Sequence, residues 1–128
     1  EESPMAYVGM MVPGFPNLFT LYGPNSQPVS GGVALPAWYQ MWAGFVARCL
    51  IGIIEQGKQT VEVTDEAFRE YNEKLVEESQ KLIMVTEEAS AKKNYYVQNG
   101  RMQVNAPWET HDYYRMTSYP DPEAIVFE

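Results

Sequence analysis

Hydrophobic residues in the first quarter of the chain form two short runs separated by turn residues. Ala6–Val12 is apolar and partly β-prone, which predicts an extended segment, and Leu18–Tyr22 is continuously apolar, as in a strand buried on both faces. Between these runs, Pro13–Asn17 combines two prolines with a glycine, a composition typical of turns. A loop rich in Gly, Pro, Asn and Ser follows over Gly23–Gly32. The pattern predicts a strand that ends in a turn at Gly23.

The next stretch, Val33–Gln56, predicts one long helix. Pro36 falls in its first turn, where the missing N–H costs nothing, and Gly57 suits the left-handed cap that ends a helix. Apolar residues surround almost the whole helix, so other elements must pack against it on several sides. A small domain on its own has few elements to do this. The apolar run Gly31–Ala47 is about as long as the shortest membrane-spanning helices. Its proline, its glycines and Gln40 favour instead a buried helix of a larger α/β body.

A strand and a second helix come next. Thr60–Val63 alternates between polar and apolar residues, which predicts a short strand. Thr64 or Asp65 then caps a helix of about 25 residues, whose apolar positions recur at spacings of three, four and seven. This pattern predicts an amphipathic helix with a charged outer face.

The last part of the chain contains a hairpin signal. Asn94–Gln98 and Arg101–Asn105 flank Asn99-Gly100, the dipeptide typical of a type I′ turn. From Ala106 onward the chain is rich in aromatics and proline, and we expect it to be extended. Together these elements predict an α/β fold, which reads as α+β when the chain is taken as an isolated fragment.

Composition narrows the classes of function. The chain has 128 residues, most simply one domain, and a net charge of −8, which repels phosphates and argues against nucleic-acid or anionic-membrane partners. The single Cys49 excludes an internal disulfide framework and fits a reducing cytoplasm. No basic segment precedes an apolar run at the start, so we expect no secretory signal, and the opening Glu-Glu-Ser-Pro fits a piece of a longer protein. The acidic residues form no compact triad, and we expect no metal site.

The turn after the predicted strand is the strongest candidate for a binding site. Gly23 allows the backbone to approach a ligand closely, while the Asn25 amide and the Ser26 hydroxyl offer donors and acceptors. Backbone N–H groups at the start of the long helix add partial positive charge. Such a site suits the pyrimidine edge of a flavin or a phosphate, and an ordinary strand-to-helix turn is the alternative. The candidate cofactor contacts are Gly23, Pro24, Asn25, Ser26, Gly31 and Gly32.

Several short motifs in a fixed order resemble the C-terminal third of class B flavoprotein monooxygenases, and the Baeyer–Villiger monooxygenases most of all. In the first half these motifs are Val12-Pro-Gly-Phe-Pro-Asn-Leu-Phe, Tyr22-Gly-Pro-Asn-Ser and Gly31-Gly32. The end of the chain is similar to the 4-hydroxyacetophenone monooxygenase subgroup, through Tyr95-Tyr96, Asn99-Gly-Arg101, Ala106-Pro-Trp108, Asp112-Tyr-Tyr-Arg-Met116 and Asp121-Pro122.

The resemblance implies a role for particular residues. It places Gly23–Ser26 and the following helix start against the flavin, and Tyr95 near the nicotinamide cofactor and the substrate cleft. Tyr95 stands where many members carry Trp, and Ser30 where many carry His. The resemblance further implies that residues 1–57 end an FAD-binding Rossmann-like domain, and that residues 58–128 supply an amphipathic helix, the hairpin and a tail.

The whole enzyme, by the same resemblance, uses FAD and NADPH and oxidises ketones to esters through a flavin C4a-peroxide. Its two Gly-x-Gly-x-x-Gly turns, its signature of Phe, Gly, His and Trp and its catalytic arginine do not occur in this sequence. We therefore assign no catalytic residue here and expect the chain to need a missing N-terminal FAD- and NADPH-binding portion. The alternative is a non-catalytic interaction or oligomerisation module, for example a homodimer built on Val33–Gln56.

Overall fold

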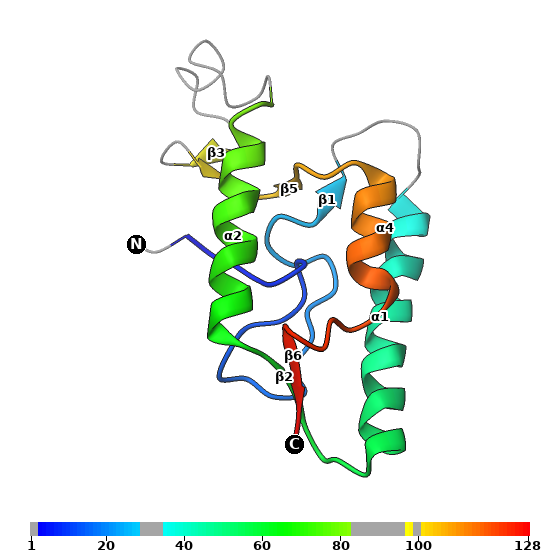
Figure 1. Cartoon of the computed structure of the whole chain (residues 1–128). Coiled ribbons are helices and arrows are strands. Elements are labelled where there is room, and N and C mark those ends of the chain that lie inside the picture. The colour runs from blue at the N-terminus through cyan, green and yellow to red at the C-terminus, as the bar shows by residue number, and fades with distance from the viewer. Residues whose placement is uncertain (1–2, 29–34, 83–96, 99–100) are drawn as a thin grey trace.

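The computed structural model describes residues 3–28, 35–82, 97–98 and 101–128, and it is a mixed helix and strand fold (Figure 1). In chain order the elements are β1 (Gln27–Pro28), α1 (Leu35–Gln56), β2 (Val61–Val63), α2 (Asp65–Ser79), β3 (Val97–Gln98), β4 (Arg101–Met102), β5 (Asn105–Ala106), α4 (Thr110–Ser118) and β6 (Ile125–Phe127). The strands form three two-stranded sheets: β1 with β5 in parallel, and β2 with β6 and β3 with β4 in antiparallel. The predicted α/β class is confirmed.

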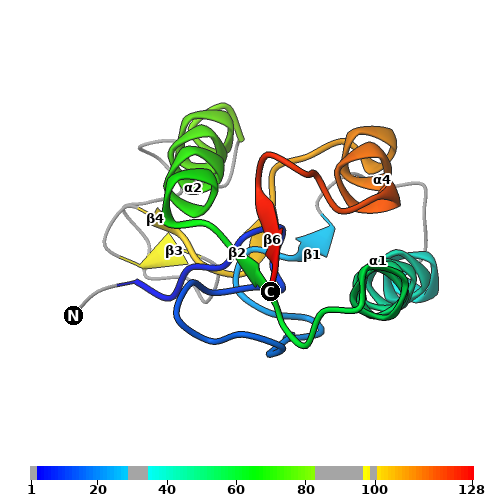
Figure 2. The ribbon, with the colours of Figure 1, turned by 60° about the horizontal axis from the view of Figure 1, so that its bottom comes forward.

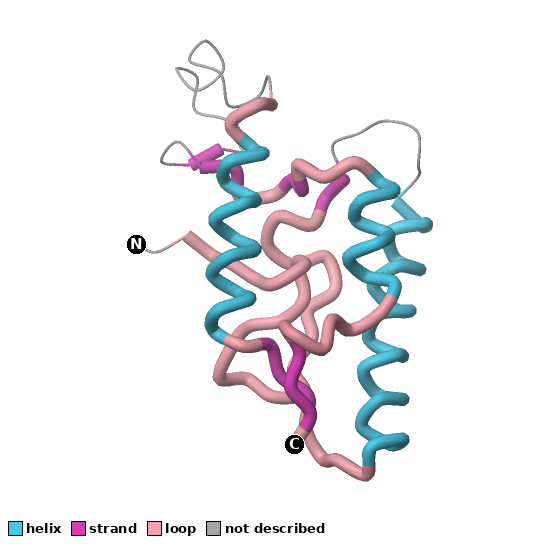
Figure 3. The backbone as a smooth tube through the Cα atoms, in the orientation of Figure 1, coloured by secondary structure: helices cyan, strands magenta, loops and turns pink. Residues whose placement is uncertain are grey.

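Helices lie on two sides of an irregular centre. α1 and α4 run side by side, α2 lies on the other side, and the β2–β6 pair stands between them (Figure 2). The middle of the molecule is filled largely by loops of the N-terminal segment rather than by a continuous sheet (Figure 3). The core therefore packs side chains of these loops against α1 and α4 and against the β2–β6 pair, with Leu75 added from α2.

α1 packs through a single face. Its buried residues recur every three or four positions, as expected for one side of a helix: Trp38, Met41, Trp42, Phe45 and Cys49. The helix ends where Gly57 adopts a φ of 62°, which confirms the predicted cap. By length and composition α1 also suits a membrane span, with a mean hydropathy of 1.2, but these buried side chains pack it against the rest of the chain. The described residues pack against one face of α1, not against several sides as predicted.

Two predictions in the N-terminal segment are wrong. Leu18–Tyr22 forms no strand, because a single backbone hydrogen bond, from the Thr20 N–H to the Met10 carbonyl, links it to another described segment, and one bond makes no ladder. Ala6–Val12 is not extended, since Tyr7 and Met11 pair across a tight turn. Val8 has a φ of 45° in that turn, an uncommon conformation for a β-branched residue, so tertiary contacts must hold it.

The predicted extended tail is also wrong. Thr110–Ser118 forms α4, which carries Asp112 in its first turn and Arg115 in its last turn, each on the side that suits the helix dipole. The chain then returns to pair β6 with β2, in a register that places Val63 opposite Ile125. The tail therefore closes the fold instead of trailing from it.

The remaining predictions hold in part. The strand at Val61–Val63 and the cap of α2 are confirmed, and the Ala67 N–H donates to the Thr64 hydroxyl over 3.2 Å. α2 ends at Ser79, earlier than predicted. The hairpin is confirmed by β3 and β4. Its Asn99-Gly100 turn lies outside the described residues, as do Ser30, Gly31, Gly32 and Tyr95.

Candidate cofactor-binding turn

The turn Gly23–Ser26 is fixed to a segment far along the chain. The Asn25 backbone N–H donates to the Gln103 carbonyl over 3.1 Å. The Asn25 side-chain Nδ2 donates to the carbonyls of Met102, over 2.7 Å, and Asn105, over 3.3 Å. Only 1% of Asn25 is exposed. This asparagine therefore joins the candidate turn to the strands β4 and β5.

The same turn is packed tightly against the N-terminal loop. A Cβ on Gly23 would lie 2.3 Å from the Gly9 carbonyl oxygen and 2.5 Å from the Thr20 hydroxyl, so the chain itself requires glycine at this position. The Ser26 hydroxyl donates to the Gly23 carbonyl over 2.6 Å. Tyr22 adopts a positive φ of 60°. Unfavourable backbone angles of this kind persist only where the surroundings hold them.

These contacts limit how the turn can meet a cofactor. The side-chain donors of Asn25 and Ser26 bond to the chain's own carbonyls. The Asn25 Oδ1 has no partner among the described residues, but it is buried. A ligand would therefore contact the half-buried Gly23-Pro24 backbone rather than these side-chain donors. Cofactor binding by Gly23, Pro24, Asn25 and Ser26 stays a prediction, and the other proposed contacts, Gly31, Gly32 and Tyr95, lie outside the described residues.

A buried aromatic cluster lies beside Tyr22, the residue before this turn, and the sequence did not reveal it. The Tyr113 hydroxyl donates to the Val8 carbonyl over 2.5 Å and accepts from the Trp42 Nε1 over 2.9 Å. Trp38 stacks on Tyr113 with ring centroids 4.3 Å apart, and the exposed Tyr22 meets the edge of Trp42. Burial raises the pKa of Tyr113 well above its ordinary value, which keeps the phenol protonated and able to donate. The cluster joins α1, α4 and the strained N-terminal turn.

Two other side chains that could carry chemistry, Arg48 and Cys49, have structural roles instead. The Arg48 Nη2 donates to the Thr117 carbonyl over 2.8 Å, and its guanidinium lies 5.7 Å from the centre of the Tyr119 ring. Arg48 therefore stabilises the C-terminal end of α4. Cys49 is fully buried, and burial raises the pKa of its thiol to about 12. A thiol in that state is a poor nucleophile.

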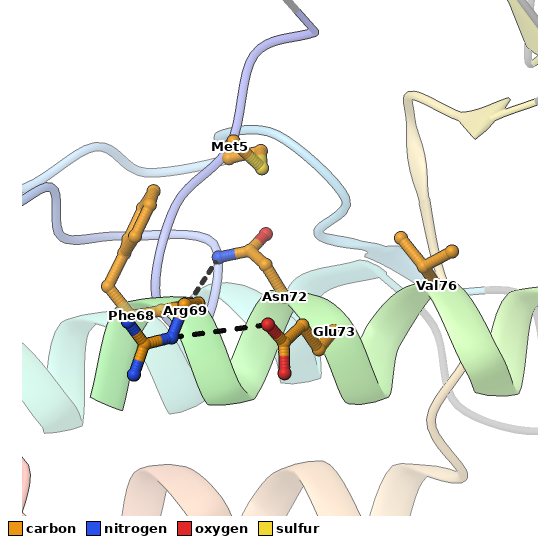
Figure 4. Close-up of a pocket in the computed structure, with 6 residues that line it drawn as sticks. All are labelled: Met5, Phe68, Arg69, Asn72, Glu73 and Val76. Atoms are coloured by element: carbon orange, nitrogen blue, oxygen red, sulfur yellow. Dashed lines mark hydrogen bonds and ion pairs between the residues drawn. The ribbon is translucent and has the colours of Figure 1, made fainter. Parts of the chain in front are cut away.

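A separate hollow of about 390 Å³ lies against α2 and the N-terminal segment (Figure 4). Met5, Phe68 and Val76 make its surface mostly apolar. Asn72 at its base donates to the Phe68 carbonyl over 2.8 Å, so its amide is occupied. The hollow can accept an apolar group, but it gathers no set of catalytic side chains. Among the described residues there is no group of His, Cys, Asp and Glu that could hold a metal ion.

The arrangement of these helices and strands is that of one portion of a flavin monooxygenase fold. The chain superposes on an oxidized steroid monooxygenase bound to NADP with a TM-score of 0.77 and 19% identity, over 97% of this chain and 23% of that one. The OTEMO complex with FAD and NADP gives 0.75 and 20%, over 98% and 23%. Cyclohexanone monooxygenase from Rhodococcus sp. Phi1 bound to NADP⁺ gives 0.75 and 16%, over the same shares. These likenesses establish the fold.

Sequence relatives agree with the fold. The chain is 29% identical over 121 residues to the uncharacterized monooxygenase y4iD of Sinorhizobium fredii, covering 94% of this chain and 18% of the relative. It is 37% identical over 67 residues to a Baeyer–Villiger monooxygenase of Pseudooceanicola batsensis, covering 52% of this chain and 12% of the relative. No family model matches the chain. The predicted resemblance to part of a Baeyer–Villiger monooxygenase is confirmed, and the chain spans less than a quarter of each of these proteins.

Proposed function

We propose that this chain is the C-terminal portion of an FAD- and NADPH-dependent monooxygenase that oxidises ketones to esters. The observation that carries the proposal is the 29% identity with a monooxygenase over 94% of the chain. The solved neighbours support the choice of cofactors, because all three bind NADP and one binds FAD as well. The ketone substrate and the route of oxygen transfer that the resemblance implies belong to the same proposal, as does a cytoplasmic location.

In the proposed enzyme this chain positions the flavin rather than reacting with the substrate. Bound flavin supplies the chemistry that carries oxygen to the ketone. The Gly23-Pro24 backbone contacts the flavin, together with Gly31 and Gly32, and Tyr95 borders the nicotinamide and substrate cleft. The Asn25 bonds to the carbonyls of β4 and β5 hold this backbone in one conformation before any ligand arrives.

A chimeric enzyme tests the proposal. The region of the Sinorhizobium fredii monooxygenase that matches this chain is replaced by residues 1–128, and ester formation from cyclohexanone is followed with NADPH present. We expect ester and NADPH consumption from the chimera and neither from the same enzyme with the region deleted. A chimera that melts cooperatively and binds both cofactors, yet converts neither cyclohexanone nor 4-hydroxyacetophenone, would contradict the assigned function.

A further inference from the structure

Tyr22, the residue before the candidate cofactor turn, has a side chain that is held in place but largely uncovered. Its hydroxyl donates to the Gln27 Oε1 over 2.9 Å, and its ring meets the edge of Trp42 with ring centroids 5.8 Å apart. Trp42 is fully buried, whereas 46% of Tyr22 is exposed. The ring of Tyr22 is therefore packed against α1 on one side and open on the other.

The backbone of Tyr22 adopts a conformation that an aromatic residue rarely takes. Its φ of 60° lies in the left-handed region, which is unfavourable for a bulky side chain and better suited to glycine or asparagine. The contacts of the side chain with Gln27 and Trp42 help to hold this conformation. A strained backbone beside a binding turn points to a function for the side chain that it carries.

The turn that follows Tyr22 leaves a ligand few directions of approach. The Cβ direction of Gly23 is closed, because a Cβ there would lie 2.3 Å from the Gly9 carbonyl oxygen. Asn25 closes a second direction, since its side chain bonds to carbonyls of β4 and β5. The hydrogen bond from Tyr22 to Gln27 carries the tyrosine ring alongside the turn, and the described residues leave that ring exposed. A ligand that reaches the turn from this side meets Tyr22.

We propose that the exposed side of the Tyr22 ring packs against the bound flavin, next to the Gly23-Pro24 backbone. The inference rests on the proposed function and adds a side chain to a turn that otherwise offers the flavin only its backbone. Aromatic rings attract one another in offset-stacked and edge-to-face arrangements, and the isoalloxazine of a flavin is a large, flat aromatic surface. Because Gln27 and Trp42 already hold the tyrosine ring, little side-chain freedom is lost when the ligand binds.

The chemistry of Tyr22 favours the ring of the flavin over a phosphate at this position. A phosphate is bound by cations and by free hydrogen-bond donors. The phenol proton of Tyr22 is already donated to Gln27, so what the side chain presents to a ligand is its aromatic ring. An aromatic ring of the ligand is the group that such a surface accepts best.

Time-resolved flavin fluorescence of the FAD-loaded chimera tests the proposal. A tyrosine in contact with an excited flavin quenches its fluorescence by transferring an electron that then returns, whereas phenylalanine does not, because its ring is much harder to oxidise. We expect Tyr22→Phe to lengthen the flavin fluorescence lifetime several-fold and to leave FAD affinity unchanged. Tyr22→Asn suits the positive φ but removes the ring, and it should weaken FAD binding about two- to tenfold. The matched control is Tyr39→Phe, which should change neither value, because Tyr39 is 48% exposed and also meets the edge of Trp42 but belongs to α1.

Each other outcome overturns the inference. An unchanged lifetime in Tyr22→Phe, together with unchanged affinity in Tyr22→Asn, would show that Tyr22 does not touch the flavin. Equal effects of Tyr22→Phe and Tyr39→Phe would mean that the flavin responds to altered packing around Trp42. Thermal melts without FAD should be nearly the same for Tyr22→Asn and the parent chimera, and weaker binding that follows a loss of folding would make Tyr22 a structural residue only. A parent chimera that binds no FAD would contradict the proposed function and this inference with it, whereas FAD binding that is indifferent to Tyr22 contradicts the inference alone.

Discussion

Replacing Tyr113 with Phe tests whether the buried aromatic cluster holds the strained N-terminal turn in place. The ring and its stacking on Trp38 survive the change, and the hydroxyl alone is lost. Two buried groups then lose their partner, the Val8 carbonyl and the Trp42 Nε1–H. A buried polar group left unpaired costs about 1–3 kcal/mol, so for the two groups together we expect the free energy of unfolding to fall by about 2–6 kcal/mol. That is a large part of the total stability of a small domain, about 5–15 kcal/mol.

Urea denaturation followed by tryptophan fluorescence and by circular dichroism measures this loss. The matched control is Tyr114→Phe on the same helix, where the side chain is 62% exposed, and it should change the free energy by no more than about 0.5 kcal/mol. The m-value should stay the same in both variants. A loss below about 0.5 kcal/mol in Tyr113→Phe would refute the reasoning, because the hydroxyl would then not be needed to satisfy the buried groups.

Tyr7, Cys49 and Gly23 each give a further test of the same structure. Burial raises the pKa of Tyr7 to about 12, so the folded chain keeps a proton that the unfolded chain releases above about pH 10. Stability should therefore fall above about pH 10, and Tyr7→Phe should make that fall shallower in urea titrations without removing it, because burial also raises the pKa values of Tyr71 and Tyr113. Cys49 should stay unmodified by iodoacetamide at pH 8 in the folded chain and react after unfolding, as mass spectrometry would show; rapid native labelling would contradict its burial. Gly23→Ala should lower the stability by about 3 kcal/mol or more through overpacking. The control Gly14→Ala should lower it by about 1–2 kcal/mol, because no atom lies near Gly14 and only its positive φ opposes alanine. Equal losses of stability in thermal melts would contradict the close approach of Gly23 to Gly9.

Elements with local signals could be predicted from the sequence. α1 has a proline in its first turn and a glycine after its last, and α2 has Thr64 at its N-cap. The hairpin at β3 and β4 follows from its Asn-Gly turn. In each case the residues that decide the structure lie within a few positions of it.

Elements that depend on distant partners could not be predicted. Leu18–Tyr22 has the composition of a buried strand, but no described segment pairs with it. The nine-residue helix α4 is short, and the burial of Tyr113 and Thr117 against the rest of the molecule stabilises it. β6 forms because it meets β2, more than sixty residues earlier in the chain. Tertiary packing decides all three.

The candidate turn shows the same division. Its position after an apolar run could be predicted from Gly23 and Pro24. The task of Asn25 could not, since its partners Met102 and Asn105 lie 77 and 80 positions away. From the sequence, the Asn25 amide is a candidate ligand contact. In the structure, its side-chain donor bonds to carbonyls of the chain itself.

Binding of FAD by the chimeric enzyme tests the central claim most directly. The Sinorhizobium fredii monooxygenase carrying residues 1–128 in place of its own matching region is titrated with FAD, and quenching of flavin fluorescence reports the bound fraction. The account predicts saturable, stoichiometric binding that is absent from the enzyme with the region deleted. A chimera that melts cooperatively at a temperature close to that of the intact relative, and still leaves all the FAD free, would contradict it.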